Sequence, residues 1–165
     1  SPLSSSSAAS DVYKRQDVAS TAIDYPLSTY LVALCAGPYH EVTDTWRGEL
    51  TAHPEGKPAQ KLEVPLGIYC RASLAHALDA ERLFTETKQG FDFYHRNFGF
   101  PYPFGKYDQI FVPEFNAGAM ENAGCVTIRD EYVFTSQATH YKYERRADTV
   151  LHLSLIHISE PTRPY

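Results

Sequence analysis

The most restrictive feature of the sequence is a segment bounded by a helix-starting residue and a helix-ending residue. Side chains suited to one buried helix face recur there at helical spacing: Leu83, Phe84, Thr87, Phe91, Tyr94 and Phe98. Asp79 before them is a favourable N-cap residue. Gly99 is suited to the helix end, and Pro101 and Pro103 cannot continue the helix. The pattern predicts an amphipathic helix between Asp79 and Gly99.

The sequence before this helix is rich in β-forming residues. Residues 27–35 and 39–46 flank a Gly-Pro turn signal and together predict a β-hairpin. Residues 62–70 predict another strand, which Pro65 should confine to a sheet edge or a bulge because proline has no N–H to donate. The first third of the chain is therefore predicted to be mainly strands.

After the helix, strands and helices are mixed. Residues 107–115 predict a short strand that runs into a loop, and residues 124–129 predict a second strand. Residues 141–152 predict a helix, with Arg145 and Arg146 on its solvated side. The whole pattern predicts an α+β fold.

Composition and charge exclude several classes of protein. The net charge is −5, from 15 basic and 20 acidic residues, which argues against a nucleic-acid partner because such binding needs a concentrated cationic face. No apolar run approaches the length of about 18 residues that a membrane helix needs, so no membrane span is predicted. The 43% of hydrophobic residues suffices for a packed core.

The cysteines and most of the histidines show no site-like spacing. Cys35, Cys70 and Cys125 form no C-x-x-C pair, and their odd number favours reduced thiols in a cytoplasmic protein. Five histidines without ligand spacing are expected to be ordinary surface or capping residues: His40, His53, His76, His95 and His140.

The segment EFNAGAMENAG, residues 114–124, has the most unusual composition. Glycines, alanines and asparagines surround Met120 and Glu121. Gly118 would let another chain approach the backbone closely. On composition alone, a surface loop with a solvated glutamate is the simpler interpretation.

The segment GAMEN at residues 118–122 resembles the exopeptidase motif of the aminopeptidase N family, whose members are zinc metallopeptidases of the gluzincin type. Flanking segments resemble the family in the expected order, and they are most similar to its actinobacterial type: STYLVALCAGPY, VPLGIYCRASL, KQGFDFYHRNFGFPYPFGKYDQ and ERRADTVLH. The resemblance covers roughly residues 17–152. It implies that residues 17–71 end an N-terminal β-sandwich-like domain and that residues 72–152 begin a thermolysin-like catalytic domain, with an edge strand near 117–122.

The resemblance also implies a role for each motif residue in hydrolysing peptides from a free N-terminus. Gly118 and Ala119 would contact the substrate backbone, and Met120 would line the pocket for the first side chain. Glu121 would bind the α-ammonium group, which has a pKa near 8 and is mostly cationic at neutral pH. Asn122 completes the motif without a chemistry of its own.

His152 would be the first ligand of a catalytic Zn²⁺ ion, on a helix that carries H-E-x-x-H in the family. The metal would activate a water molecule and polarise the scissile carbonyl. The sequence departs from this pattern, because Leu153 stands in place of the general-base glutamate and Ile156 in place of the second histidine. His157 cannot substitute, since residues five apart point about 140° apart around a helix. We therefore predict an incomplete zinc site, no catalytic residue and an inactive chain.

Both flanks differ in character from the sequence between them. Residues 1–16 and 153–165 resemble translated sequencing adapters and are expected to be unrelated or artefactual.

Two alternatives to a plain aminopeptidase stay open. One is a leukotriene-hydrolase-like enzyme with epoxide hydrolase activity. The other is a non-catalytic peptide-binding or scaffold relative that lost the metal site. The oligomeric state stays open as well.

Overall fold

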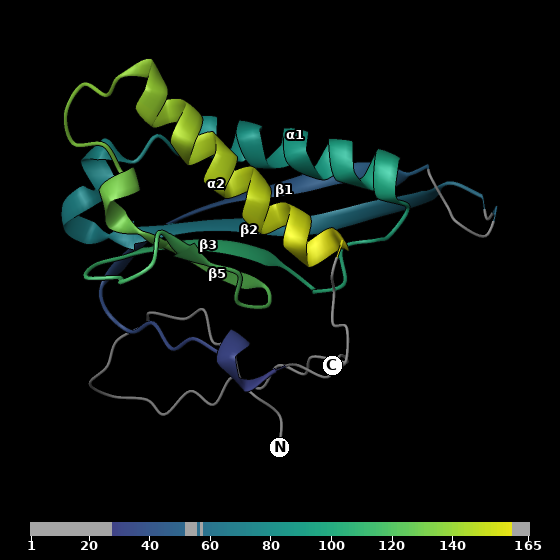
Figure 1. Ribbon diagram of the computed structural model, residues 1–165, viewed down its shortest axis with the longest axis horizontal. Coiled ribbons are helices and arrows are strands. Elements are labelled where there is room, and N and C mark those ends of the chain that lie inside the picture. Colours follow the sequence, from purple (N-terminus) through teal and green to yellow (C-terminus); the bar gives the residue numbers. More distant parts are fainter. Residues whose placement is uncertain (1–27, 52–55, 57, 160–165) are drawn as a thin grey trace.

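A computed structural model describes residues 28–51, 56 and 58–159, and it shows a five-stranded sheet with two long helices on one face (Figure 1). The prediction of an α+β fold is confirmed. The strands are β1 (Tyr39–Leu50), β2 (Gln60–Arg71), β3 (Tyr107–Val112), β4 (Ala119–Met120) and β5 (Cys125–Arg129). The helices are α1 (Ala80–Phe98) and α2 (His140–Ser159), with short 3₁₀ turns η1 (Thr29–Leu31), η2 (Ala72–Ala77) and η3 (Asp130–Tyr132).

The strand order is β1-β2-β3-β5-β4. β1 pairs antiparallel with β2 along its whole length, β2 and β3 are parallel, β3 and β5 are parallel, and β4 closes the sheet antiparallel to β5. The hairpin predicted across residues 27–46 is wrong. The segment before β1 holds η1 instead of a strand, and the partner of β1 comes from β2, beyond the next loop.

Pro65 lies in an inner strand, which corrects the prediction of an edge. Its location still costs no hydrogen bond in the ladder between β2 and β3. Pro65 faces Thr45 of β1, whereas the ladder between β2 and β3 begins at the next residue, Leu66. The missing N–H therefore falls outside the stretch where β2 is paired on both sides.

The sheet is continuous across the predicted domain division near Arg71. β2 ends at that residue and is hydrogen-bonded both to β1 and to β3. In the described residues, β1 and β2 therefore belong to the same sheet as the strands that carry the motif.

α1 confirms the helix predicted between Asp79 and Gly99. It begins at Ala80, ends at Phe98, and is followed by Gly99 in the left-handed conformation at φ 73°. The buried face contains the predicted residues except Phe98, which is 43% exposed. Asp79 precedes the helix as predicted, but its side chain makes no cap hydrogen bond.

The Asp79 carboxylate instead binds Arg146 of α2. Arg146 Nη1 lies 2.7 Å from Asp79 Oδ1, and Nη2 lies 2.5 Å from Oδ2. Arg146 Nη1 also donates to the carbonyl oxygen of Tyr132 at 3.2 Å. Arg146 is only 1% exposed, so the prediction that it faces solvent is wrong, whereas Arg145 is exposed as expected. The buried ion pair ties the beginning of α1 to α2.

An aromatic cluster fills the core between α1 and the sheet. The Phe91 ring lies 5.3 Å from Trp46 of β1 and 5.2 Å from Tyr107 of β3, measured between ring centroids. His95 belongs to the same cluster, because it is fully buried and stacks on Trp46 at 4.4 Å. The prediction that His95 is a surface or capping residue is therefore wrong.

His95 is held as a neutral imidazole by two hydrogen bonds. Its Nδ1 donates to the Phe91 carbonyl at 2.7 Å, and its Nε2 accepts from the Tyr102 backbone N–H at 3.1 Å. An imidazole nitrogen that accepts a hydrogen bond carries no proton of its own. Burial lowers the pKa of His95, partly opposed by the hydrogen bond to Phe91 and by the nearby Asp92 carboxylate.

Acidification should therefore destabilise the fold through His95. A histidine of lowered folded-state pKa binds fewer protons than in the unfolded chain, so its contribution to stability is complete above about pH 6.5 and is lost as pH falls toward the folded-state pKa. We expect urea unfolding midpoints to drop between about pH 7.5 and 5.5, and to drop less in the His95→Gln variant. Equal slopes in wild type and His95→Gln would contradict this assignment.

Candidate functional site

The motif at 118–122 forms the outer edge of the sheet. Ala119 pairs with Ile128 and Met120 with Thr127, and the Arg129 N–H donates to the Gly118 carbonyl at 3.1 Å. The prediction of an edge strand near 117–122 is confirmed. β4 has β5 on one side, and no strand of the described residues lies on its other side. Such an edge can pair with an added extended chain.

The surface over the motif is open at Gly118. Gly118 is exposed, and a Cβ placed on it would meet no atom within 4 Å among the described residues other than its two chain neighbours. Packing against the described residues therefore does not explain the glycine. The geometry agrees with the expectation that another chain can approach the backbone here.

Glu121 follows β4 directly, between two anchored positions. Met120 and Glu121 are both half-buried. The ladder to β5 holds the chain before Glu121, and a turn holds it afterwards: the Cys125 N–H donates to the Asn122 carbonyl at 3.0 Å. Gly124 takes a left-handed conformation in this turn, at φ 69°. The backbone of Glu121 is therefore held where the edge strand ends.

Asn122 has a structural contact that the sequence did not reveal. It is only 4% exposed, and its Nδ2 donates to Thr127 Oγ1 at 3.0 Å. Thr127 lies on β5 opposite Met120 and is 3% exposed. Sequence reasoning did not single out Thr127. The available signal was a lone hydroxyl residue in the middle of the short strand CVTIR.

Cys125 begins β5 at the end of the same turn. Burial raises the pKa of its thiol to about 12, helped by the nearby Asp108 carboxylate. A thiol of such a pKa stays protonated at neutral pH and is a poor nucleophile. Cys35, Cys70 and Cys125 are all free thiols, as predicted.

His152 lies on α2, which also contacts β4. α2 does not stop there as predicted but continues without a break to Ser159. His152 is exposed, whereas the next residue, Leu153, is 2% exposed and belongs to the hydrophobic core. The backbone of His157 is helical, and its side chain lies outside the described part.

The residues present do not fit a zinc ion. Among the described residues, no group of three histidine, cysteine, aspartate or glutamate side chains could hold a metal. A catalytic zinc site needs three protein ligands. Next to His152, the buried Leu153 has no oxygen or nitrogen in its side chain. His152 thus stands as a single predicted ligand.

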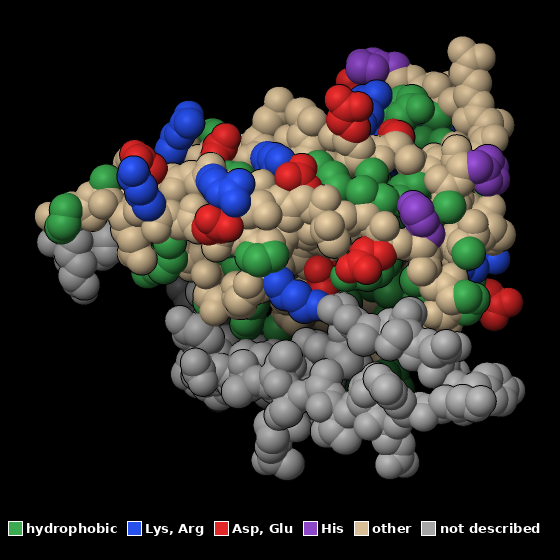
Figure 2. All heavy atoms as spheres, turned by 180° about the vertical axis from the view of Figure 1, so that it is seen from behind, with side chains coloured by type: hydrophobic (Ala, Val, Ile, Leu, Met, Phe, Trp, Pro, Cys, Tyr) green, Lys and Arg blue, Asp and Glu red, His purple; other side chains and the backbone are tan. Residues whose placement is uncertain are grey.

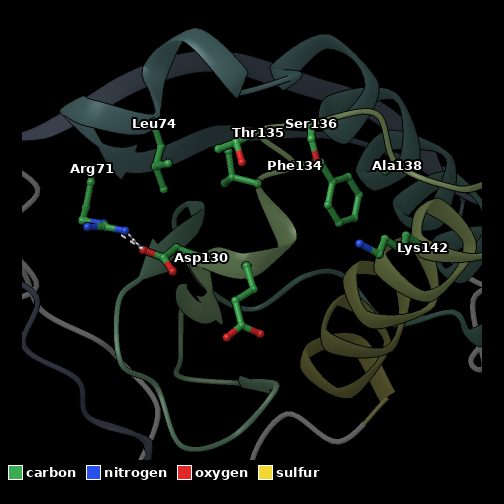
Figure 3. Close-up of a pocket in the computed structure, with 10 residues that line it drawn as sticks. Arg71, Leu74, Asp130, Phe134, Thr135, Ser136, Ala138 and Lys142 are labelled. Atoms are coloured by element: carbon green, nitrogen blue, oxygen red, sulfur yellow. Dashed lines mark hydrogen bonds and ion pairs between the residues drawn. The ribbon is translucent and has the colours of Figure 1, made fainter.

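A separate pocket of about 300 Å³ lies between Arg71, η3 and the beginning of α2. Figure 3 shows Lys142 reaching toward it from α2, and Arg71 paired with Asp130 at 2.8 Å on the opposite side. The pocket contains none of the motif residues. The motif is instead an open sheet edge.

Two further observations concern partners. No helix in the described part is both long and apolar enough to cross a membrane. Figure 2 shows basic side chains interspersed with acidic ones over the face that it displays.

Comparison with known proteins places the motif within a region that matches a peptidase family. The pattern of the Peptidase family M1 domain matches residues 83–158, which include both the motif and His152. The Streptomyces lividans aminopeptidase N is 56% identical over 126 residues. The chain belongs to the aminopeptidase N family. This confirms the resemblance to that family, and with it membership of a peptidase family.

Other members of the aminopeptidase N family are more distant. The Mus musculus aminopeptidase N is 37% identical over 95 residues, and the Sus scrofa glutamyl aminopeptidase is 33% identical over 134 residues. These alignments cover 57% and 80% of the chain, and the Streptomyces alignment covers 76%. The chain spans only 13%, 10% and 12% of the Streptomyces, mouse and pig relatives.

Proposed function

We propose that this chain is part of an aminopeptidase that removes N-terminal residues from peptides, and that β4 and Glu121 bind the peptide's N-terminus. The observation that supports this most is the placement of Glu121 directly after a two-residue strand at the sheet edge. We also propose that the division between N-terminal and catalytic parts lies before β1 instead of near Arg71, because β1 and β2 share the sheet with β4.

The edge strand and the carboxylate would recognise different parts of the substrate. The outer edge of β4 would hydrogen-bond to the backbone of the first residues, as a strand added to a sheet does. Met120, half-buried beside this edge, would contact the first side chain. Glu121 would bind the α-ammonium with a charge-assisted hydrogen bond, which an internal peptide bond cannot offer. The glutamate would thus select the end of a chain.

We assign the zinc chemistry to the proposed parent protein, because no group of three possible ligands occurs among the described residues of this chain. A bound zinc ion would supply an activated water. The residues described here do not fit the metal, so we propose that the chain itself has no peptidase activity. Peptides with a free N-terminus remain the proposed substrates, and the three free thiols favour a cytoplasmic location.

Exchanging the Glu121 carboxylate for an amide should abolish selection of the free N-terminus. We expect trialanine amide to bind the full chain at least about tenfold more tightly than its N-acetylated form, because hydrogen bonds to charged groups contribute about 1.5–3 kcal/mol. Titrations followed by NMR would measure both affinities. Glu121→Gln should bind the two peptides equally well.

Glu131→Gln provides the matched control, since Glu131 is exposed and pairs with Arg129. This variant should keep the wild-type preference. If wild type binds both peptides equally, or if Glu121→Gln keeps the preference, the proposed role of Glu121 is wrong.

The continuous helix favours a second candidate, a non-catalytic peptide-binding relative. Leu153 and Ser154 are both buried in α2, so the non-ligand sequence packs well at this position. Sequencing the source gene across codon 153 distinguishes the two. A glutamate codon there, followed by a histidine codon three positions later, supports the enzyme. The present sequence in an intact reading frame supports the non-catalytic relative.

A further inference from the structure

Thr127 lies where it can control the position of Glu121 without contacting a substrate. Its Oγ1 accepts the hydrogen bond from Asn122 Nδ2 at 3.0 Å, and both side chains are almost completely buried. Asn122 is the residue next to Glu121 in the chain. A buried hydrogen bond between two otherwise unsolvated polar groups is costly to remove, because water cannot replace the lost partner.

The hydrogen bond crosses the turn that joins the motif to β5. Thr127 faces Met120 in the ladder, on the strand that leaves the turn, whereas Asn122 lies two residues after the end of β4, where the turn begins. The backbone bond from Cys125 to Asn122 closes the turn at 3.0 Å, but it leaves the Asn122 side chain free to rotate. The contact to Thr127 removes that freedom. Glu121 is consequently fixed from the β4 ladder on one side and from Asn122 on the other.

We propose that Thr127 is a positioning residue whose hydroxyl, through Asn122, sets the Glu121 carboxylate at the angle that binds a peptide α-ammonium group. This inference rests on the proposed function of Glu121. Charge-assisted hydrogen bonds depend on direction, so a carboxylate that turns away from the edge of β4 discriminates poorly. Loss of the hydroxyl should therefore reduce selectivity for the free N-terminus more than it reduces binding of the peptide backbone.

Thr127→Val tests this, because it keeps the branched shape and removes the hydroxyl. In NMR titrations of the full chain, trialanine amide should bind about tenfold more weakly to the variant, whereas the N-acetylated peptide should bind as to wild type. Thr127→Ser restores a hydroxyl and should recover the preference. Thr85→Val removes an exposed threonine hydroxyl from α1 and should change neither affinity.

The outcomes separate this inference from the proposed function. If wild type shows no preference for the free N-terminus, the proposed function fails and the inference fails with it. If wild type shows the preference and Thr127→Val keeps it, only the positioning role is overturned. If Thr127→Val does not fold, Thr127→Ala decides, because it also removes the hydroxyl. A folded Ala variant that loses the preference supports the role of the hydroxyl, and one that keeps the preference overturns it.

Discussion

Replacing Asp79 with alanine should lower the free energy of unfolding by about 3 kcal/mol, because it leaves a buried guanidinium without its carboxylate. Arg146 is 1% exposed, whereas the Asp79 side chain is 34% exposed, so the cost comes mainly from the arginine. The Tyr132 carbonyl would remain as a partner, but it carries no charge. Chemical denaturation followed by circular dichroism measures the effect.

Two further variants show whether burial is the cause. Asp44→Ala removes an ion pair to Lys88 in which both side chains are about one-third exposed, and it should cost less than about 1 kcal/mol. Combining Asp79→Ala with Arg146→Met should recover part of the lost stability, because no unpaired charge stays buried. An Asp79→Ala variant as stable as Asp44→Ala would show that the pair does not stabilise the fold.

Phe91→Ala should cost about 4 kcal/mol through the cavity that it leaves in the aromatic cluster. The ring is fully buried and contacts Trp46, His95, Tyr102 and Tyr107, so few neighbours can move to fill the space. Phe93→Ala, two residues along the same helix and 59% exposed, is the matched control and should cost far less. Similar denaturation midpoints for the two variants would contradict the assignment of Phe91 to the core.

The helix α1 could be predicted because the residues that determine it lie next to one another in the sequence. α1 follows from side-chain spacing, Gly99 and the prolines, all within one stretch of chain. The edge strand and its motif were predicted from resemblance, and the structure places them at the end of the sheet. The role of Glu121 stays a prediction, because no ligand contact tests it.

The errors concern residues whose environment depends on distant partners. The sequence predicted that residues 27–35 pair with β1. The partner is β2, which follows a loop after β1, and no local sequence signal specifies this pairing. Arg146 and His95 were assigned to the surface by residue type. Each is buried beside particular partners: the Asp79 carboxylate binds both terminal nitrogens of Arg146, and two backbone groups bind the ring nitrogens of His95.

Some of the predictions concern residues outside the described ranges. The flank 1–16 lies wholly outside them, as do residues 160–165 of the second flank and His53. The family pattern continues to residue 158, and α2 to Ser159. The assignment of 153–165 to an unrelated flank stays a prediction.

The length of β4 limits how many residues of a bound peptide could pair with the sheet. A strand of two residues spans only about 7 Å, so in the proposed complex backbone pairing would reach no further than the first residues of the peptide. The rest of the peptide would make no backbone hydrogen bonds to β4, so the sheet would not select its sequence. The same shortness gives other copies of the protein little edge on which to pair. In the proposed complex, a brief edge strand would therefore combine tolerance for many peptides with a small edge for pairing between copies of the protein.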